Sequence, residues 1–196
     1  MDYKEILGII AVVLAFGTYI PIYFGIFFGK VRPHIFTYLV WTITVGFAFV
    51  SSFLSGGGAG SWVLGVTVFL VGGIFLLCFK YGTKDITRFD TVALFFAIAA
   101  LVPWFITKDP TISIILITII EITSFFPTFR KTWNDPYSEI AFPWVINSAK
   151  HALTVLAVSS VSVATVFYPA VLISINLLLA GEIMYRKIVF KKLNKS

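Results

Sequence analysis

The sequence predicts an all-α integral membrane protein, and three observations lead to that fold class. Of the 196 residues, 59% are hydrophobic and only 12% are charged, which lies far outside the range of soluble globular proteins. Apolar runs of about 20 residues, the length that crosses a bilayer core of ~30 Å, recur along the chain. Basic residues gather in the intervals between those runs. Because a backbone in lipid must satisfy its own hydrogen bonds, runs of this length favour a helical bundle over a barrel.

Seven transmembrane helices are expected. They cover residues 5–28, 34–54, 62–79, 90–107, 111–131, 139–160 and 163–185. The first has neither a basic leader nor an A-x-A cleavage pattern, so we expect a retained helix and not a removed signal peptide. The single cysteine, Cys78, excludes an intrachain disulfide.

The first three helices are joined by short turns. Pro21, near the end of the first helix, removes a backbone hydrogen bond and predicts a kink. The turn SGGGAGS after the second helix is too rich in glycine to hold one conformation, and is interpreted as a slack connector or a moving gate. In the third helix, Gly72 and Gly73 permit close helix packing.

The polar connector KYGTKDITRFD precedes the fourth helix, which has no ionisable residue in its middle and is interpreted as a spacer. The fifth and sixth helices carry Pro127 and Pro143. The seventh is followed by the basic tail KIVFKKLNKS, which is interpreted as an orientation signal with some attraction to anionic lipid, rather than as a specific partner site.

Lys and Arg residues are divided unequally between the two expected sides of the membrane. One side has Lys30, Arg32, Lys80, Lys84, Arg88, Arg130, Lys131, Arg186, Lys187, Lys191, Lys192 and Lys195. The other has only Lys4 and Lys108, and Lys150 falls inside a helix. The positive-inside rule then predicts an external N-terminus and a cytoplasmic C-terminus, with an odd number of helices. The compact chain is typical of a prokaryotic inner membrane protein.

The two halves of the chain resemble each other at a shift of 106 positions. TYIPIYF at 18–24 then meets SFFPTFR at 124–130, and FTYLVW at 36–41 meets FPWVIN at 142–147. We therefore predict a first three-helix repeat over 1–82, a linker helix over 83–110 and a second repeat with the basic tail over 111–196. Because a single linker helix separates the two three-helix repeats, both repeats cross the membrane in the same orientation. They are then related by a rotation axis along the membrane normal.

These features resemble the PQ-loop superfamily, which includes the SWEET sugar transporters, the lysosomal cystine transporter and the KDEL receptors. The resemblance covers nearly the whole chain and rests on the 3+1+3 layout, the external N-terminus and the prolines Pro21 and Pro127. It implies two three-helix bundles and alternating access. Pro21, Pro127 and Pro143 have two compatible interpretations, static kinks or hinges, and in a protein built from repeats we favour hinges.

The chain departs from that superfamily at several positions. The glutamine after each signature proline is replaced by Ile22 and Thr128. SWEET transporters carry a fourth proline where this chain has Thr37, and an asparagine on the third helix where it has Leu70. The resemblance therefore supports the architecture and alternating access better than it supports a sugar as the substrate.

Polar side chains are expected near the bilayer midplane. A rise of ~1.5 Å per residue places Glu121, Lys150 and Asn176 about 15 Å from the cytoplasmic helix ends. Thr18 reaches a similar level. Asn147, Lys150 and His151 have i, i+3, i+4 spacing and share one face of a helix.

Isolated charges at that depth cost at least ~3 kcal/mol, so Glu121 and Lys150 should face each other or line a wet cavity. Burial favours their neutral forms and pairing holds both ionised. A structural ion pair is one interpretation, and we favour a role in substrate or proton handling. Asn176 is interpreted either as a hydrogen-bonding link between helices or as a ligand contact. His151 is interpreted either as a proton relay or as a side chain hydrogen-bonded to a neighbour. Trp41 either packs between helices or stacks over a ligand.

Motifs of soluble enzymes such as HExxH, GxSxG and GxxxxGK[ST] are missing, so no enzyme is predicted. Two distant histidines and one cysteine predict no metal site, and no cofactor is expected. The net charge of +6 reflects membrane orientation, so nucleic acid is not an expected partner. Expected partners are the lipid bilayer and a small polar solute, with proton coupling and homo-oligomers left open.

The leading functional hypothesis is a small secondary transporter that moves a small polar solute by alternating access. The expected site residues are Thr18, Trp41, Glu121, Asn147, Lys150, His151 and Asn176. The alternative is a membrane receptor or sensor that binds a ligand without carrying it across. A channel ranks third, because no polar stripe repeats along the helices.

Overall fold

The computed structural model describes residues 1–29, 31–82, 88–138 and 140–193. Within them the chain is all-helical, as predicted. It forms α1 (Tyr3–Phe27), α2 (Ile35–Leu54), α3 (Ala59–Tyr81), α4 (Arg88–Ala99), α5 (Val102–Thr107), α6 (Pro110–Asn134), the short 3-10 helix η1 (Pro136–Ser138), α7 (Ala141–Ala157) and α8 (Val163–Leu193).

Four helices of the described chain are long and apolar enough to cross a membrane. They are α1, α2, α3 and the part of α8 from Val163 to Lys191. Shorter apolar helical stretches cover Leu94–Thr107 and Pro110–Phe126. Large apolar side chains also point outward, such as Phe69, which is 81% exposed. By length and composition, the chain is an integral membrane protein.

The helix expected over 90–107 is two helices, because the chain turns at Ala100 and Leu101. Pro103 is the second residue of α5 and has no amide hydrogen to continue the ladder of α4. The amide of Trp104 is satisfied instead by the carbonyl of Leu101, at 3.1 Å, and the hydroxyl of Ser113, at 3.1 Å. The expected spacer is therefore a broken helix pinned to α6.

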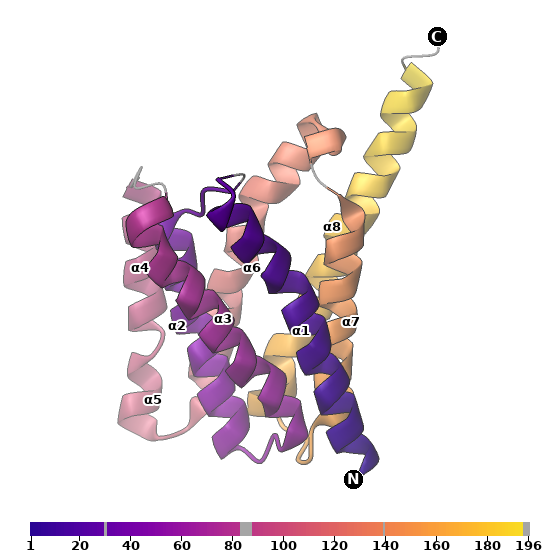
Figure 1. Cartoon of the computed structure of the whole chain (residues 1–196). Helices are drawn as coiled ribbons and strands as arrows, with labels where there is room; N and C mark the ends of the chain where they lie inside the picture. Colours follow the sequence, from indigo (N-terminus) through magenta and orange to yellow (C-terminus); the bar gives the residue numbers. More distant parts are fainter. Residues whose placement is uncertain (30, 83–87, 139, 194–196) are drawn as a thin grey trace.

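The helices run alternately between the two ends of the bundle (Figure 1). In that view the N-terminus lies at the lower end and the C-terminus at the upper end, with α4 and α5 descending one after the other. The α2–α3, α5–α6 and α7–α8 turns all lie at the N-terminal end. The last turns of α8 project beyond the rest of the bundle.

The six longer helices pack in two similar sets. α3 contacts both α1 and α2, and α8 contacts both α6 and α7. Between the sets, α1 contacts α7, α2 contacts α6, α3 contacts α7 and α2 contacts α8. The core shared by the two sets includes Ala15, Leu64, Ile117 and Leu179. Gly73 leaves room for the Tyr23 hydroxyl, as close packing of α1 on α3 requires.

Two turns at the N-terminal end are joined by backbone hydrogen bonds. The amide of Ser159 donates to the carbonyl of Gly57 at 3.2 Å, and the amide of Ser160 donates to the carbonyl of Gly56 at 3.0 Å. Gly56 and Gly58 have φ values of +78° and +54°, which other residues rarely adopt. The glycines therefore shape a defined turn that ties α2–α3 to α7–α8, and the slack connector expected there was wrong. We call this contact the turn–turn bridge.

Candidate functional site

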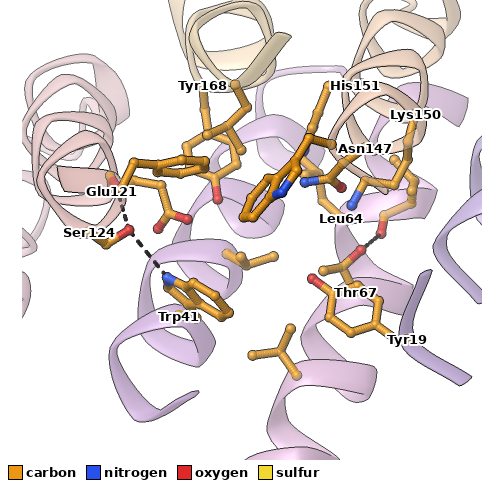
Figure 2. A pocket seen from close by; sticks show the side chains of 16 residues that line it. Tyr19, Trp41, Leu64, Thr67, Glu121, Ser124, Asn147, Lys150, His151 and Tyr168 are labelled. Atoms are coloured by element: carbon orange, nitrogen blue, oxygen red, sulfur yellow. Dashed lines mark hydrogen bonds between the residues drawn. The ribbon is translucent and has the colours of Figure 1, made fainter. Parts of the chain in front are cut away.

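A cavity of about 80 Å³ lies between the two helix sets (Figure 2). Its lining comes from α1, α2, α3, α6, α7 and α8, so both sets contribute. The side chains that line it are Tyr19, Trp41, Val45, Val63, Leu64, Thr67, Val71, Glu121, Ser124, Phe125, Trp144, Asn147, Lys150, His151, Tyr168 and Leu172. Apolar and aromatic walls thus surround a few polar groups, which is typical of a small-molecule site.

Glu121 brings a carboxylate to this cavity from α6. Its side chain is only 6% exposed, and the hydroxyl of Thr44 donates a hydrogen bond to Oε2 at 2.9 Å. The next turn of α6 presents Ser124, whose hydroxyl donates to the carbonyl of Glu121 at 2.6 Å. Trp41 Nε1 donates a long hydrogen bond of 3.5 Å to that same hydroxyl (Figure 2). The carboxylate is therefore held in place from α2.

Lys150 brings the opposite charge from α7 and is only 2% exposed. Its ammonium lies 5.6 Å from the centroid of the Tyr19 ring, a favourable cation–π position. Figure 2 shows Glu121 and Lys150 at opposite sides of the cavity, both directed into it. Among the residues that the structure describes, neither takes part in an ion pair, so the two charges share a cavity without pairing.

Asn147 and Asn176 join α7 to α8. The Asn147 amide group donates to Asn176 Oδ1 at 3.1 Å, and Asn176 Nδ2 donates to the carbonyl of Leu172 at 2.7 Å. Asn176 is fully buried and is not part of the cavity lining. The hydrogen bond from Asn147 makes Asn176 a polar link between α7 and α8. Asn147 does line the cavity, and its buried Oδ1 has no hydrogen-bond partner.

His151 lies one residue after Lys150 on α7 and is 4% exposed. Its ring meets that of Tyr168 edge to face at a centroid distance of 6.3 Å. The buried Nδ1 has no hydrogen-bond partner. Because buried polar atoms are nearly always satisfied, unpartnered atoms on His151 and Asn147 mark a place where a ligand or water is expected.

The structure brings five of the seven expected site residues to one cavity: Trp41, Glu121, Asn147, Lys150 and His151. Asn176 supports one of them from outside. Thr18 does not line this cavity: its hydroxyl donates to the carbonyl of Leu14 at 2.9 Å, and the lining residue of α1 is the next one, Tyr19. Successive helical residues differ by about 100° in direction, so a correct depth does not fix the face.

Sequence reasoning missed Tyr19, Thr44, Ser124 and Tyr168. The internal repeat could have found the first two. Tyr19 is 106 positions from Phe125, and both line the cavity. Thr44 is 106 positions from Lys150 and binds Glu121. Trp41 and Asn147 form another such pair, and so do Val45 and His151.

The three expected hinge prolines lie in different helical contexts. Pro21 lies inside α1, and Pro127 lies inside α6. Pro143 is the third residue of α7, where amides have no intrahelical partner, so this proline removes no helical hydrogen bond that would cause a kink. The expected helix 139–160 is shorter than predicted, which puts this proline in its first turn. Pro169, which was not singled out from the sequence, lies buried inside the continuous helix α8.

No group of three or more His, Cys, Asp or Glu residues in the described chain could hold a metal ion. The cavity offers a carboxylate, an ammonium, an amide oxygen and an imidazole nitrogen, surrounded by aromatic rings. Such a set can bind and orient a small polar molecule. Comparisons with protein families, curated proteins and solved structures find no match to this chain.

Proposed function

We propose that this protein is a small secondary transporter that moves a small polar solute by alternating access around the cavity. The observation that carries the proposal is the pair Glu121 and Lys150, two buried charges that line one cavity without pairing. An ionised side chain within a membrane helix costs several kcal/mol unless it is paired or functional. Their placement is best accounted for by a solute that compensates them.

The proposed topology has seven crossings, with α4 and α5 together forming the fourth. α1–α3 and α6–α8 would be repeats related by an axis along the membrane normal. The matching contacts support this arrangement, since α3 packs on α1 and α2 as α8 packs on α6 and α7. The positions 106 apart that meet at the cavity support it too. The uneven distribution of Lys and Arg supports an external N-terminus and a cytoplasmic C-terminus, and the compact chain is typical of a prokaryotic inner membrane protein.

Alternating access requires the two repeats to separate at one end while they close at the other. The turn–turn bridge joins the repeats at the N-terminal end, through carbonyls of Gly56 and Gly57 and amides of Ser159 and Ser160. This end would therefore be closed in the present conformation. Pro21 and Pro127 occupy equivalent places in α1 and α6 and would serve as hinges.

The same bridge favours one second candidate, a receptor that holds its ligand and opens to one side only. The two functions differ in solvent access. Tyr19→Cys, in a Cys78→Ala background, places a thiol in the cavity wall. A transporter exposes this thiol to membrane-impermeant reagents from both faces of oriented vesicles. Labelling from one face alone, with and without ligand, supports the receptor.

Ligand binding is tested by thermal unfolding of the purified protein with representative sugars, amino acids, nucleosides and vitamins. A solute bound to the folded state raises the melting temperature. Glu121→Gln and Lys150→Met should abolish that rise. Glu182→Gln is a matched control, because Glu182 also accepts a threonine hydroxyl, that of Thr132 at 2.8 Å, but does not line the cavity.

A solute that passes this test is then loaded into an uptake assay with liposomes. Uptake by the parent protein and by Glu182→Gln, but not by the two cavity variants, supports the transporter. If no solute raises the melting temperature of the parent, the cavity is not a ligand site. If the solute still stabilises both cavity variants, the charged pair has a structural role.

A further inference from the structure

We propose that the ligand of this cavity is a small zwitterion, whose anionic group binds Lys150 and whose cationic group binds Glu121. The inference rests on the proposed function, because it takes the cavity as the ligand site. It adds the chemical class of the ligand and its orientation, with the anionic group at Lys150 and the cationic group at Glu121.

The first step concerns the two charges themselves. Glu121 on α6 and Lys150 on α7 are 6% and 2% exposed and line the same 80 Å³ cavity. A direct salt bridge would compensate both, yet none is formed. Figure 2 shows the carboxylate and the ammonium entering the cavity from opposite sides. The space between them is therefore bounded by one negative and one positive end.

The second step concerns how little of each charge the protein satisfies. Glu121 accepts one side-chain hydrogen bond, from Thr44 to Oε2, and its Oε1 has no donor among the described residues. Lys150 has three ammonium hydrogens, and within the described chain the ammonium makes no hydrogen bond but lies over the Tyr19 ring, 5.6 Å from its centroid. Each group thus retains the capacity for strong, charge-assisted hydrogen bonds to an occupant.

The third step compares the occupants that could supply those bonds. A neutral polyol compensates neither charge. A simple cation satisfies Glu121 but then meets the like charge of Lys150, and a simple anion satisfies Lys150 but meets Glu121. A molecule with one charge of each sign compensates both ends at once and needs no counter-ion. Electrostatic complementarity therefore selects the zwitterion and rejects the other classes.

The fourth step concerns size and the remaining polar atoms. The cavity exceeds the ~30 Å³ occupied by a water molecule, but is far smaller than the roughly 300–1,000 Å³ of sites for drug-sized ligands. Asn147 Oδ1 and His151 Nδ1, buried and without partners, are left to orient a compact ligand. Trp41, which bonds to Ser124 one turn from Glu121, and Phe125, one turn after Glu121, line the cavity near its carboxylate end, and aromatic rings can attract a cationic group.

The test uses full-length protein and four matched probes of three to five heavy atoms. They are glycine, the zwitterion; acetate, the anion; ethylamine, the cation; and ethylene glycol, the neutral molecule. Binding is measured by calorimetry and by the shift in melting temperature. Glycine should bind and the other three should bind much more weakly. Glu121→Gln and Lys150→Met should each weaken glycine binding by about 10- to 100-fold, the loss expected for a hydrogen bond to a charged group.

The variants also predict a gain that misfolding cannot mimic. Glu121→Gln removes the repulsion felt by an anion, so acetate should bind it more tightly than it binds the parent. Lys150→Met should likewise gain affinity for ethylamine. Glu182→Gln should leave all four profiles unchanged. Tighter acetate binding by Glu121→Gln and tighter ethylamine binding by Lys150→Met would show which end of the ligand each charged residue binds.

The outcomes separate this inference from the function on which it rests. If ethylene glycol, acetate or ethylamine binds the parent better than glycine does, and the cavity variants reduce that binding, the ligand site stands and the zwitterion is refuted. If glycine binds equally well to both cavity variants, the orientation is refuted. If none of the four probes binds, the small zwitterion is refuted, and the ligand site itself is then decided by the wider panel of solutes described above.

Discussion

Replacement of Thr44 by valine tests whether the carboxylate of Glu121 is held ready by α2. The two side chains have nearly the same shape, so the change removes the hydroxyl and little else. In the structure this hydroxyl donates to Glu121 Oε2 at 2.9 Å, and both residues are buried. A hydrogen bond to a charged group contributes about 1.5–3 kcal/mol, and its loss leaves the buried carboxylate without a side-chain donor. We expect Thr44→Val to reduce the free energy of unfolding by that amount.

At roughly 2–4 °C per kcal/mol for a chain of this size, the melting temperature should fall by about 3–12 °C. Thr42→Val is the matched control, since Thr42 lies on the same helix and its hydroxyl donates only to the carbonyl of Tyr38, one turn earlier. That local bond leaves no buried charge behind when it is removed. Melting of the purified variants in one detergent gives both values. Equal melting temperatures for Thr44→Val and the parent would refute the role assigned to Thr44.

Three further predictions follow from other parts of the structure. The pair Gly56→Cys/Ser160→Cys tests whether the turn–turn bridge must open. An ideal Cβ on Gly56 lies 3.1 Å from Ser160 Cβ, slightly under the ~3.5 Å of disulfides, so the pair should cross-link at the cost of strain at the positive φ of Gly56. The oxidised protein should not take up solute while the reduced protein does, and uptake by the oxidised form would show that the bridge need not open. Gly60→Ala should lower the melting temperature although alanine favours the helix, because its Cβ would lie 2.7 Å from the backbone oxygen of Thr154 on α7. An unchanged or higher melting temperature would mean that α3 and α7 can move apart freely. Hydrogen bonds from the side chain and backbone of Thr111 hold the pKa of the exposed Asp109 below its usual value. The ionised carboxylate therefore stabilises the fold above pH ~4, and this stabilisation is lost as the pH falls through the lowered pKa. Asp109→Asn should make the melting temperature depend less on pH in this acid range, and the same pH dependence in variant and parent would contradict the prediction.

The class of fold was readable from the chain because it depends on local properties. Long apolar runs with internal hydrogen bonds have few alternatives to a helix in lipid, and the described chain is indeed all-helical. Helix ends were less accurate. Pro103 divided the expected fourth helix, and the later start of α7 moved Pro143 into a first turn, where a proline causes no break.

Much of the candidate site was also predictable. Counting residues from the helix ends placed Glu121 and Lys150 at one depth, and both line one cavity. The expected repeat could have added Thr44, the counterpart of Lys150, and Tyr19, the counterpart of Phe125. Thr18 does not line the cavity, because its side chain lies on another face of α1, where its hydroxyl bonds to the carbonyl of Leu14.

The sequence by itself therefore determined which segments are helical, and a constant rise along the helix axis predicts the depth of each polar residue. Only the tertiary structure decided which way those residues face. It left Glu121 and Lys150 unpaired, set Asn176 against Asn147 and joined two distant turns in the turn–turn bridge. Those outcomes depend on the rotation and approach of neighbouring helices, which packing between distant parts of the chain fixes and no local pattern records.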